Sequence, residues 1–172
     1  MKFLNNKLYI SKEVTLDVDD YVPLFLNFCD EANEQVFFRY VTDICLLEIG
    51  FNTVNGCLCS IKIVQSSEIV HCSMLGQLFL TNSVDGLIGC DLSLWKNKKI
   101  LDCDYSFSLF IDGCSLIVKL SEFPADKIIR NKTIYFGCSN DDLCWIVVSK
   151  LSLSDLNKVN EVVSKQQNHG FL

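Results

Sequence analysis

The stretch FSLFIDGCSLIVKL, residues 107–120, decides the fold class of this chain. Both halves have the two-residue period of a β-strand that buries one face. Phe107, Leu109 and Ile111 alternate with Ser106 and Ser108, and Leu116, Val118 and Leu120 share a face opposite Lys119. Between the halves, Asp112-Gly113 supplies the positive φ angles that tight turns require. The stretch therefore predicts an antiparallel hairpin.

Two further hairpins are predicted on either side of this one. Apolar and β-branched runs at 43–51 and 57–64 flank the dipeptide Asn55-Gly56, a strong turn signal. Runs at 133–138 and 143–150 flank a polar turn at 139–142. We therefore expect most of the chain to be a succession of antiparallel hairpins.

The C-terminal segment predicts a helix. Ser154 is a candidate N-cap, Asp155 lies in the favourable first turn, and Lys165 lies near the negative end. Apolar residues recur between them at helical spacing, namely Leu156, Val159, Val162 and Val163. We expect an amphipathic helix that packs on a sheet, followed by a polar, frayed tail at 166–172 that contains His169.

These elements predict an α+β fold class. Antiparallel hairpins with a segregated C-terminal amphipathic helix form a sandwich or a partly open barrel. The acidic, aromatic segment 17–34 is interpreted as a loop or short helix before the first main strand. The chain has 172 residues, 49% of them hydrophobic, and shows no repeat or linker, so residues 1–172 are expected to form one domain.

The sequence favours a soluble, cytoplasmic protein. Residues 1–10 lack the continuous apolar region of a secretory signal. No run reaches the ~18–20 apolar residues that a membrane helix needs. The ten cysteines are therefore expected to be reduced, and those in or beside predicted strands are expected to act as small buried hydrophobes. Seven of them lie in or beside predicted strands: Cys45, Cys57, Cys59, Cys103, Cys114, Cys138 and Cys144.

The net charge limits the classes of molecule that the protein is expected to bind. Fifteen basic and twenty-one acidic residues give a formal charge of −6. Direct binding of nucleic acid is disfavoured, since that affinity depends on clustered Lys and Arg. A negative surface suits a basic protein partner, although solubility alone also explains a modest negative charge.

Catalytic and metal-binding patterns are sparse. The histidines are His71 and His169, and His71 precedes Cys72 on a strand, where neighbouring side chains point to opposite faces. Cys57 and Cys59 are spaced too closely for a zinc knuckle and lack a matching pair. We therefore predict no enzyme activity, no cofactor and no metal site. A cysteine-dependent enzyme is the least favoured alternative.

The candidate binding residues are acidic. Residues 65–99 form the least periodic part of the chain, and long irregular connections in compact domains are usually functional. Asp102 and Asp104 follow this segment and are expected to share a strand face. The predicted partner-binding set is Glu68, Asp85, Asp91, Asp102 and Asp104.

Several stretches together resemble a family of bacterial immunity proteins, which are encoded beside polymorphic or contact-dependent growth-inhibition toxins. The resemblance covers about residues 43–154 as a diffuse strand pattern. It is carried by Leu47-Glu48-Ile49-Gly50, Asn55-Gly56, Ser60-Ile61-Lys62-Ile63-Val64, Gly86-Leu87-Ile88-Gly89-Cys90-Asp91 through Trp95, Phe107-Ser108-Leu109-Phe110-Ile111, the strand around Ile117, Ile134-Tyr135-Phe136-Gly137 and Leu143-Cys144-Trp145-Ile146. The chain has Ile88 where such families commonly have a proline after Gly-Leu.

The resemblance implies a protein that binds the C-terminal domain of its own toxin, often a nuclease, and blocks the active site. The alternative is a cytosolic β-sandwich or barrel module that binds a small ligand. The sequence leaves the toxin's identity, the docking surface and the oligomeric state open.

Overall fold

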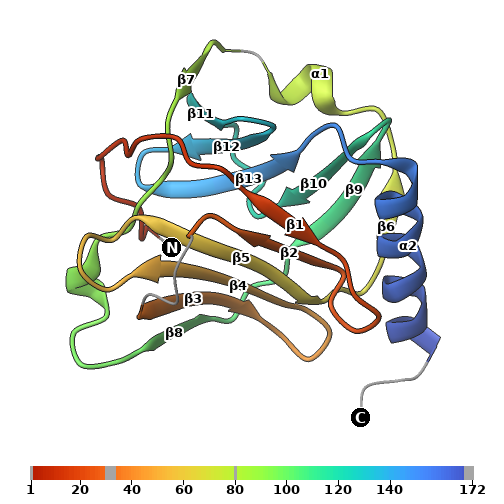
Figure 1. The fold of residues 1–172 in the computed structure, drawn as a ribbon, viewed down its shortest axis with the longest axis horizontal. Helices are drawn as coiled ribbons and strands as arrows, with labels where there is room; N and C mark the ends of the chain where they lie inside the picture. The colour runs from red at the N-terminus through yellow and green to blue at the C-terminus, as the bar shows by residue number, and fades with distance from the viewer. Residues whose placement is uncertain (1, 30–33, 80, 169–172) are drawn as a thin grey trace.

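The structure is a computed structural model that describes residues 2–29, 34–79 and 81–168, which form two β-sheets and a C-terminal helix (Figure 1). The six-stranded sheet has the order β1 (Thr15–Asp17), β2 (Leu24–Asn27), β5 (Leu58–Gln65), β4 (Leu46–Asn52), β3 (Gln35–Val41), β8 (Ile100–Cys103). The seven-stranded sheet has the order β6 (Ile69–His71), β9 (Ser108–Asp112), β10 (Ser115–Lys119), β13 (Asp142–Val148), β12 (Ile134–Ser139), β11 (Lys127–Asn131), β7 (Ser83–Asp85). Within the described residues, the two outer strands of each sheet do not pair with each other, so neither sheet closes on itself. The predicted fold class is confirmed, as a sandwich-like arrangement and not a closed barrel.

The three predicted hairpins are confirmed. They are β4–β5, β9–β10 and β12–β13, and each pairs antiparallel. Gly56 and Gly113 have φ angles of +74° and +56°, so both turn glycines adopt the left-handed conformation that their position requires. Local sequence signals thus fix the centre of both sheets.

Three pairings depart from the mainly antiparallel pattern that the sequence predicts. Strand β8 runs parallel to β3, β6 runs parallel to β9, and β7 runs parallel to β11. The cause is the path of the chain between the sheets. After β5 the chain crosses over and places β6 and β7 on the two outer edges of the seven-stranded sheet, then returns as β8. The irregular segment 65–99 therefore joins the two sheets, and it also contains α1 (Leu75–Leu78) and the 3₁₀ turn η1 (Leu92–Leu94).

The prediction of a loop or short helix for residues 17–34 is wrong over the part of this segment that the structure describes. Strands β1 and β2 pair antiparallel there. Between them the Asp19 carboxylate accepts hydrogen bonds from the backbone N–H groups of Tyr21 and Val22 at 2.7 and 2.6 Å, which makes a tight turn. A strand of four residues such as β2 is too short to give a clear period among acidic neighbours.

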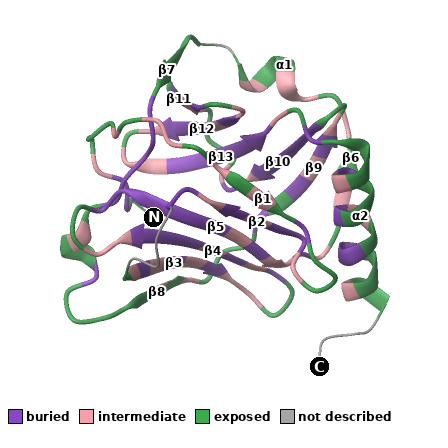
Figure 2. Ribbon diagram, in the orientation of Figure 1, coloured by how far each residue is buried: buried purple, intermediate pink, exposed green. Residues whose placement is uncertain are grey.

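One large hydrophobic core lies between the sheets and extends to the C-terminal helix (Figure 2). Its largest side chains come from both sheets and from the N-terminal segment; Phe3, for example, stacks on Phe38 with ring centroids 4.2 Å apart. The predicted apolar face of the helix, Leu156, Val159, Val162 and Val163, is buried. This core holds the strand ends and loops that form the surfaces described below.

The helix α2 (Leu153–Asn168) starts and ends differently from the prediction. Ser152 caps it in place of Ser154, because the Ser152 hydroxyl accepts from the backbone N–H of Asp155 at 3.0 Å and donates to its carboxylate at 2.6 Å. Residues 166–168 belong to the helix and not to a tail, and Gln166 donates to the carbonyl of Val64 at 2.8 Å. His169 lies outside the described residues. No helix in the described ranges has the length and apolar character to cross a membrane.

A second, smaller hydrophobic cluster lies against α1. It contains Trp145 and Ile117 of the seven-stranded sheet, and Leu75 and Leu78 of α1 pack against it. The Asp112 carboxylate accepts from the backbone N–H groups of Met74 and Leu75 at 2.8 and 2.9 Å, which fixes the start of α1. Part of the irregular segment 65–99 thus covers the seven-stranded sheet.

Candidate functional site

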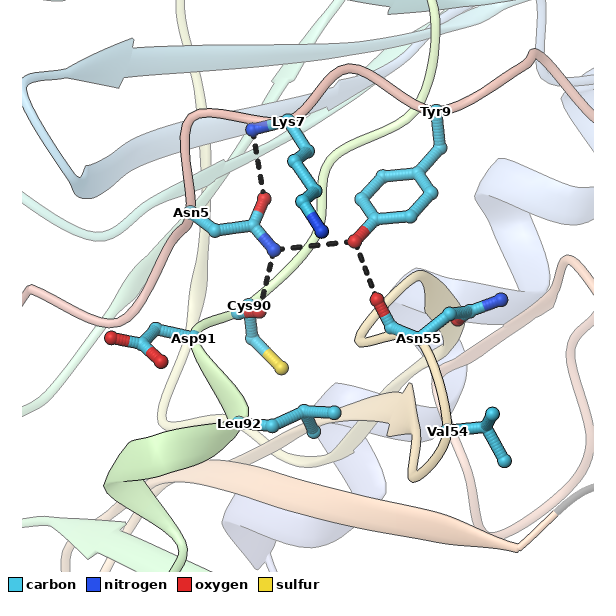
Figure 3. Close-up of a pocket in the computed structure, with 8 residues that line it drawn as sticks. All are labelled: Asn5, Lys7, Tyr9, Val54, Asn55, Cys90, Asp91 and Leu92. Atoms are coloured by element: carbon cyan, nitrogen blue, oxygen red, sulfur yellow. Dashed lines mark hydrogen bonds between the residues drawn. The ribbon is translucent and has the colours of Figure 1, made fainter.

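The hollow in Figure 3 has a volume of about 440 Å³ and lies where the N-terminal strap, residues 2–12, crosses the sandwich. It is lined by Asn5, Lys7, Tyr9, Val54, Asn55, Cys90, Asp91 and Leu92. The Asn5 amide donates to the Cys90 carbonyl at 2.6 Å and to the Tyr9 hydroxyl at 3.2 Å, and that hydroxyl donates to the Asn55 carbonyl at 2.5 Å. These polar groups bond to one another and not toward a ligand.

Gly89 shows why this region is closely packed. Its carbonyl accepts from the backbone N–H of Asn5 at 2.9 Å, and its backbone forms a bridge to Cys57. A Cβ at position 89 would overlap the Tyr9 ring and lie 2.8 Å from the Gly56 carbonyl oxygen. Three distant segments therefore meet at this glycine, and the hollow marks a structural seam.

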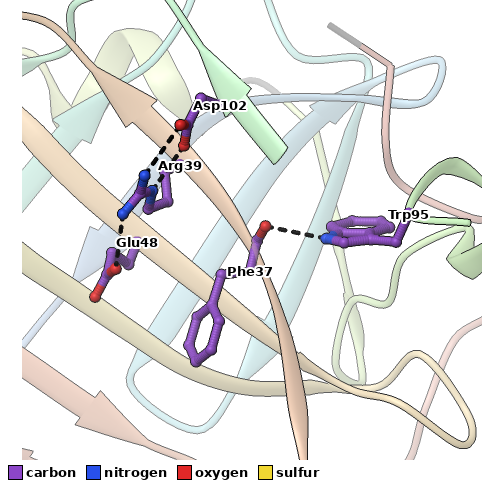
Figure 4. Close-up of polar contacts among 5 residues, drawn as sticks. All are labelled: Phe37, Arg39, Glu48, Trp95 and Asp102. Atoms are coloured by element: carbon purple, nitrogen blue, oxygen red, sulfur yellow. Dashed lines mark hydrogen bonds and ion pairs between the residues drawn. The ribbon is translucent and has the colours of Figure 1, made fainter. Parts of the chain in front are cut away.

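Asp91 and Trp95, which the sequence analysis above names, belong to the same seam. The Asp91 carboxylate accepts from the backbone N–H of Ser93 at 3.0 Å and caps η1. Trp95, at the end of η1, is buried, and its indole N–H donates to the Phe37 carbonyl at 3.0 Å (Figure 4). Much of the 86–95 stretch that carries the family resemblance thus has a structural role.

Two of the predicted acids are paired with arginines of the same chain. The Asp102 carboxylate on β8 accepts from Arg39 Nε and Nη2 at 2.7 and 3.0 Å, and Arg39 Nη1 lies 3.8 Å from Glu48 Oε2 (Figure 4). Asp85 on β7 accepts from Arg130 Nε at 2.6 Å. The hydrogen bonds from these guanidinium groups lower the pKa of both carboxyls. Part of the negative charge that was expected to meet a partner is therefore balanced within the chain.

The five predicted acids do not form one surface. Glu68 is exposed just before β6 and Asp85 lies on β7, and these strands are the opposite edges of the seven-stranded sheet. Asp102 lies on β8, an outer edge of the other sheet, and Asp91 lies at the seam. Asp104, which is exposed just beyond the end of β8, adjoins a different feature.

That feature, here called the Tyr105–Phe123 surface, consists of two adjoining hollows formed by β3, the end of β8, the loop between β10 and β11, and the β12–β13 hairpin around its turn. The first has a volume of about 180 Å³ and is lined by Tyr40, Cys103, Tyr105, Leu120, Ser121, Phe123, Asp142 and Leu143. The second has a volume of about 270 Å³ and is lined by Ser121, Phe123, Pro124, Ser139, Asn140, Asp142 and Cys144. Phe123 is shared by both and is 76% exposed, while Tyr105 is 49% exposed. Two large aromatic side chains are thus presented to solvent on one surface.

Hydrogen bonds of backbone N–H groups fix the main chain that carries both rings. The loop between β10 and β11 is tied down where the N–H groups of Leu120 and Ser121 both donate to the Cys144 carbonyl, at 2.8 and 3.1 Å. Phe123 N–H donates to the Ser121 hydroxyl at 3.1 Å. Tyr105 N–H donates to the Cys103 carbonyl at 2.8 Å in a turn that ends β8. Both exposed rings are therefore carried on hydrogen-bonded main chain, which lowers the backbone entropy lost on binding.

The ionisable side chains that line the Tyr105–Phe123 surface include the carboxylate of Asp142. Among the residues that the structure describes, no Lys, Arg or His lines either hollow, while Asp142 lines both. Burial, followed by the charges of Asp142 and Asp126, raises the pKa of Cys144 to about 11. Burial is thus the main cause of that rise in pKa, and the two carboxylates add to it.

The thiols do not favour nucleophilic catalysis. Burial is the main cause that raises the pKa of Cys59, Cys90 and Cys138, each to about 12, and a thiol with a raised pKa is a poor nucleophile at neutral pH. The ten cysteines are free, and the expectation of burial is wrong for Cys114, which is exposed in the β9–β10 turn, and holds only in part for Cys103. Over the described ranges, no three His, Cys, Asp or Glu side chains are grouped closely enough to hold a metal ion.

Of the residues at this surface, Asp104 was predicted from the sequence to contact a partner, whereas Tyr105, Phe123 and Asp142 were not. A usable signal existed in Phe123-Pro124, since a large aromatic residue beside a proline between two strands is a candidate for an exposed turn. The chain matches no protein-family model, and no curated protein is detectably similar to it in sequence.

Proposed function

We propose that this protein is an immunity protein that binds the C-terminal toxin domain of its own polymorphic or contact-dependent growth-inhibition system. The observation that carries the proposal is the Tyr105–Phe123 surface, where two exposed aromatic rings border two adjoining hollows. The resemblance of residues 43–154 to immunity proteins supports it independently.

The chemistry of this surface suits a basic toxin domain, and we propose a nuclease. A nuclease must attract phosphate, so its active-site face is commonly positive. A chain of net charge −6 would steer toward that face. Aromatic side chains that become buried at the centre of an interface supply most of the binding energy in protein complexes. Binding there would block access of nucleic acid to the toxin's active site, in the cytoplasm, without any reaction by the inhibitor.

The proposed contact set differs from the acids first predicted. Its centre is Tyr105 and Phe123, with Asp142 between the hollows and Asp104 beside Tyr105. Glu68, Asp85, Asp91 and Asp102 lie on other edges or at the seam and are placed outside this centre.

Co-expression tests the proposal. The toxin domain encoded beside this protein's gene is induced in cells that carry the protein, an empty vector, Phe123→Ala or Leu153→Ala. Leu153 is the matched control, since it is 72% exposed, compared with 76% for Phe123, and begins α2. We expect survival with the wild-type protein and Leu153→Ala, and killing with Phe123→Ala. Equal killing with and without the wild-type protein would contradict the immunity function.

A small-ligand-binding module is the second candidate function. The hollow at the N-terminal strap, at about 440 Å³, falls within the ~300–1,000 Å³ of typical ligand sites. It ranks second because Asn5 and Tyr9 direct their polar atoms to other protein groups. Native mass spectrometry of the purified protein would support this candidate if it detected a retained small molecule.

A further inference from the structure

Strand β8 has a free outer edge. It is the last strand of the six-stranded sheet, and among the residues that the structure describes it pairs with β3 alone. Figure 1 shows β8 at the lower border of the sandwich, with no described helix or strand beyond it. It has four residues, whereas the other outer strands, β1, β6 and β7, have three each. An unpaired edge of this kind is a template for pairing with another strand.

Two residues of β8 turn their backbone groups to this edge. The Lys99 carbonyl accepts from the backbone N–H of Phe37 on β3 at 2.8 Å, so position 99 faces β3. Since alternate residues of a strand turn their N–H and C=O groups to the same side, Leu101 also faces β3, and Ile100 and Asp102 face outward. The Leu101 side chain packs against the core, whereas Ile100 is 41% exposed. The edge therefore offers two donors and two acceptors beside an exposed apolar side chain.

The charges at the two ends of β8 are opposite in sign. Lys98 and Lys99 precede the strand, Asp104 follows it, and all three are exposed. The ion pairs of the described residues involve none of these three side chains. An antiparallel neighbour with the same sequence would place its acidic end beside the basic end of β8, and its basic end beside the acidic end. A second copy of the chain is therefore complementary to this edge in charge.

We propose that two copies of this protein pair antiparallel through β8 about a twofold axis, which joins their six-stranded sheets into one continuous sheet. The axis passes beside Leu101, so this residue lies opposite Leu101 of the second copy and extends the apolar face of the sheet. Ile100 of each copy then exchanges two backbone hydrogen bonds with Asp102 of the other. Lys98 of each copy lies opposite Asp104 of the other.

Charge selects this register over its nearest rival. Opposite residues of an antiparallel pair share a face, so a twofold axis must pass beside a residue and not between two. An axis beside Leu101 or beside Asp102 keeps three strand residues of each copy paired. The axis beside Asp102 would place two identical carboxylates directly opposite each other, which is unfavourable.

The dimer goes beyond the proposed function and does not depend on it, since neither Tyr105 nor Phe123 belongs to the paired strand. Sedimentation velocity of the full-length protein, from about 1 to about 300 µM, tests it. We expect a reversible dimer with a Kd of roughly 10 µM, because an interface of this size is small, and weaker association at high salt. A monomer over the whole range would overturn the proposal.

Charge reversal tests which residues meet. Asp104→Lys should weaken the dimer at least about tenfold, because the twofold axis repeats the like-charge contact, and Lys98→Glu with Lys99→Glu should do the same. The three substitutions combined should restore the dimer. Glu68→Lys is the matched control, since it changes the net charge by the same amount as Asp104→Lys at an exposed position beside the other sheet. Failure of the combined variant to dimerise, or equal weakening by the control, would contradict pairing through β8.

Amide hydrogen exchange followed by NMR tests the register, and the same spectra check that each variant is folded. At about 300 µM the N–H groups of Ile100 and Asp102 should exchange at least about threefold more slowly than at about 10 µM, since each becomes hydrogen-bonded in the dimer. The N–H of Leu101, which faces β3, should change less. Concentration-dependent protection at β1, β6 or β7, with β8 unchanged, would overturn the proposal.

Discussion

The N-terminal strap hollow and the Tyr105–Phe123 surface are both concave, but their side chains are arranged in opposite ways. At the strap, Asn5 and Tyr9 bond to each other and to backbone carbonyls, and Gly89 allows three segments to approach closely. At the Tyr105–Phe123 surface, the backbone makes the hydrogen bonds and the two rings face solvent. Asn5 and Tyr9 are therefore engaged in contacts that hold the fold together, and we propose the Tyr105–Phe123 surface as the binding site.

The largest effect on stability is expected at the seam, from Gly89→Ala. The new methyl group would overlap the Tyr9 ring and crowd the Gly56 carbonyl, which belongs to the backbone and cannot shift as a flexible side chain can. Overpacking of this kind destabilises by about 3 kcal/mol, which lowers the Tm of a chain of this size by about 10 °C. Gly76→Ala is the control, since nothing lies within 4 Å of its added Cβ. Thermal unfolding of the two variants measures the difference, and equal Tm values would mean that the seam is not tightly packed.

The next effect concerns binding and not stability. Phe123→Ala should weaken the toxin complex by about 2 kcal/mol, or roughly 30-fold in Kd, because exposed aromatic anchors are typical binding hot spots. Its free energy of unfolding should change by less than about 0.5 kcal/mol, since the side chain is 76% exposed. Calorimetric titration and urea unfolding measure the two quantities, with Leu153→Ala as the control. A variant that loses stability while it keeps affinity would reverse the roles of the two regions.

Tyr9→Phe should lower the stability of the protein and leave its neutralisation of the toxin unchanged. This is the reverse of the result expected for Phe123→Ala, and the effect should be smaller. It removes the hydroxyl that donates to the Asn55 carbonyl and accepts from the Asn5 amide. We expect a loss of about 1 kcal/mol in unfolding free energy, the usual contribution of such hydrogen bonds, and unchanged neutralisation of the toxin. Urea unfolding with the co-expression assay tests both parts, and reduced neutralisation at unchanged stability would assign the strap to the interface.

The smallest effect is expected from Asp102→Asn, which removes the ion pair with Arg39. The Asp102 side chain is half exposed, so solvent screening limits the loss at pH 7 to about 0.5 kcal/mol. Because the folded-state pKa of Asp102 is lowered below its unfolded value of about 3.9, the stabilisation is complete above that value and disappears as the pH falls through the folded-state pKa. Unfolding curves of variant and wild type at pH 7 and pH 2.5 should therefore converge at the lower pH. A gap that widens in acid would contradict this account of the pair.

The sequence predicted those parts of the fold whose signals are local. Asn55-Gly56 and Asp112-Gly113 marked their turns, and the spacing of Leu156 and Val159 marked the helix. The parallel edge strands escaped prediction because their partners lie far along the chain and a short strand such as β6 or β7 has no clear period.

The candidate site was harder to predict than the fold for the same reason. The charge of Asp85 is balanced by Arg130, 45 residues away, and that of Asp102 by Arg39, 63 residues away. The sequence shows an acid but not its partner, so both acids were interpreted as contacts for another protein. Phe123 escaped prediction because an apolar residue is expected to be buried until its exposure is known.

Hydrogen–deuterium exchange of the protein alone and in complex with the toxin domain tests the central claim most directly, since it maps which of the two regions the partner covers. We predict slower exchange on binding in peptides spanning 101–107 and 120–126, and unchanged exchange in peptides spanning 3–9 and 52–57. Protection of the strap and the β4–β5 turn, with the Tyr105–Phe123 surface unchanged, would contradict the account.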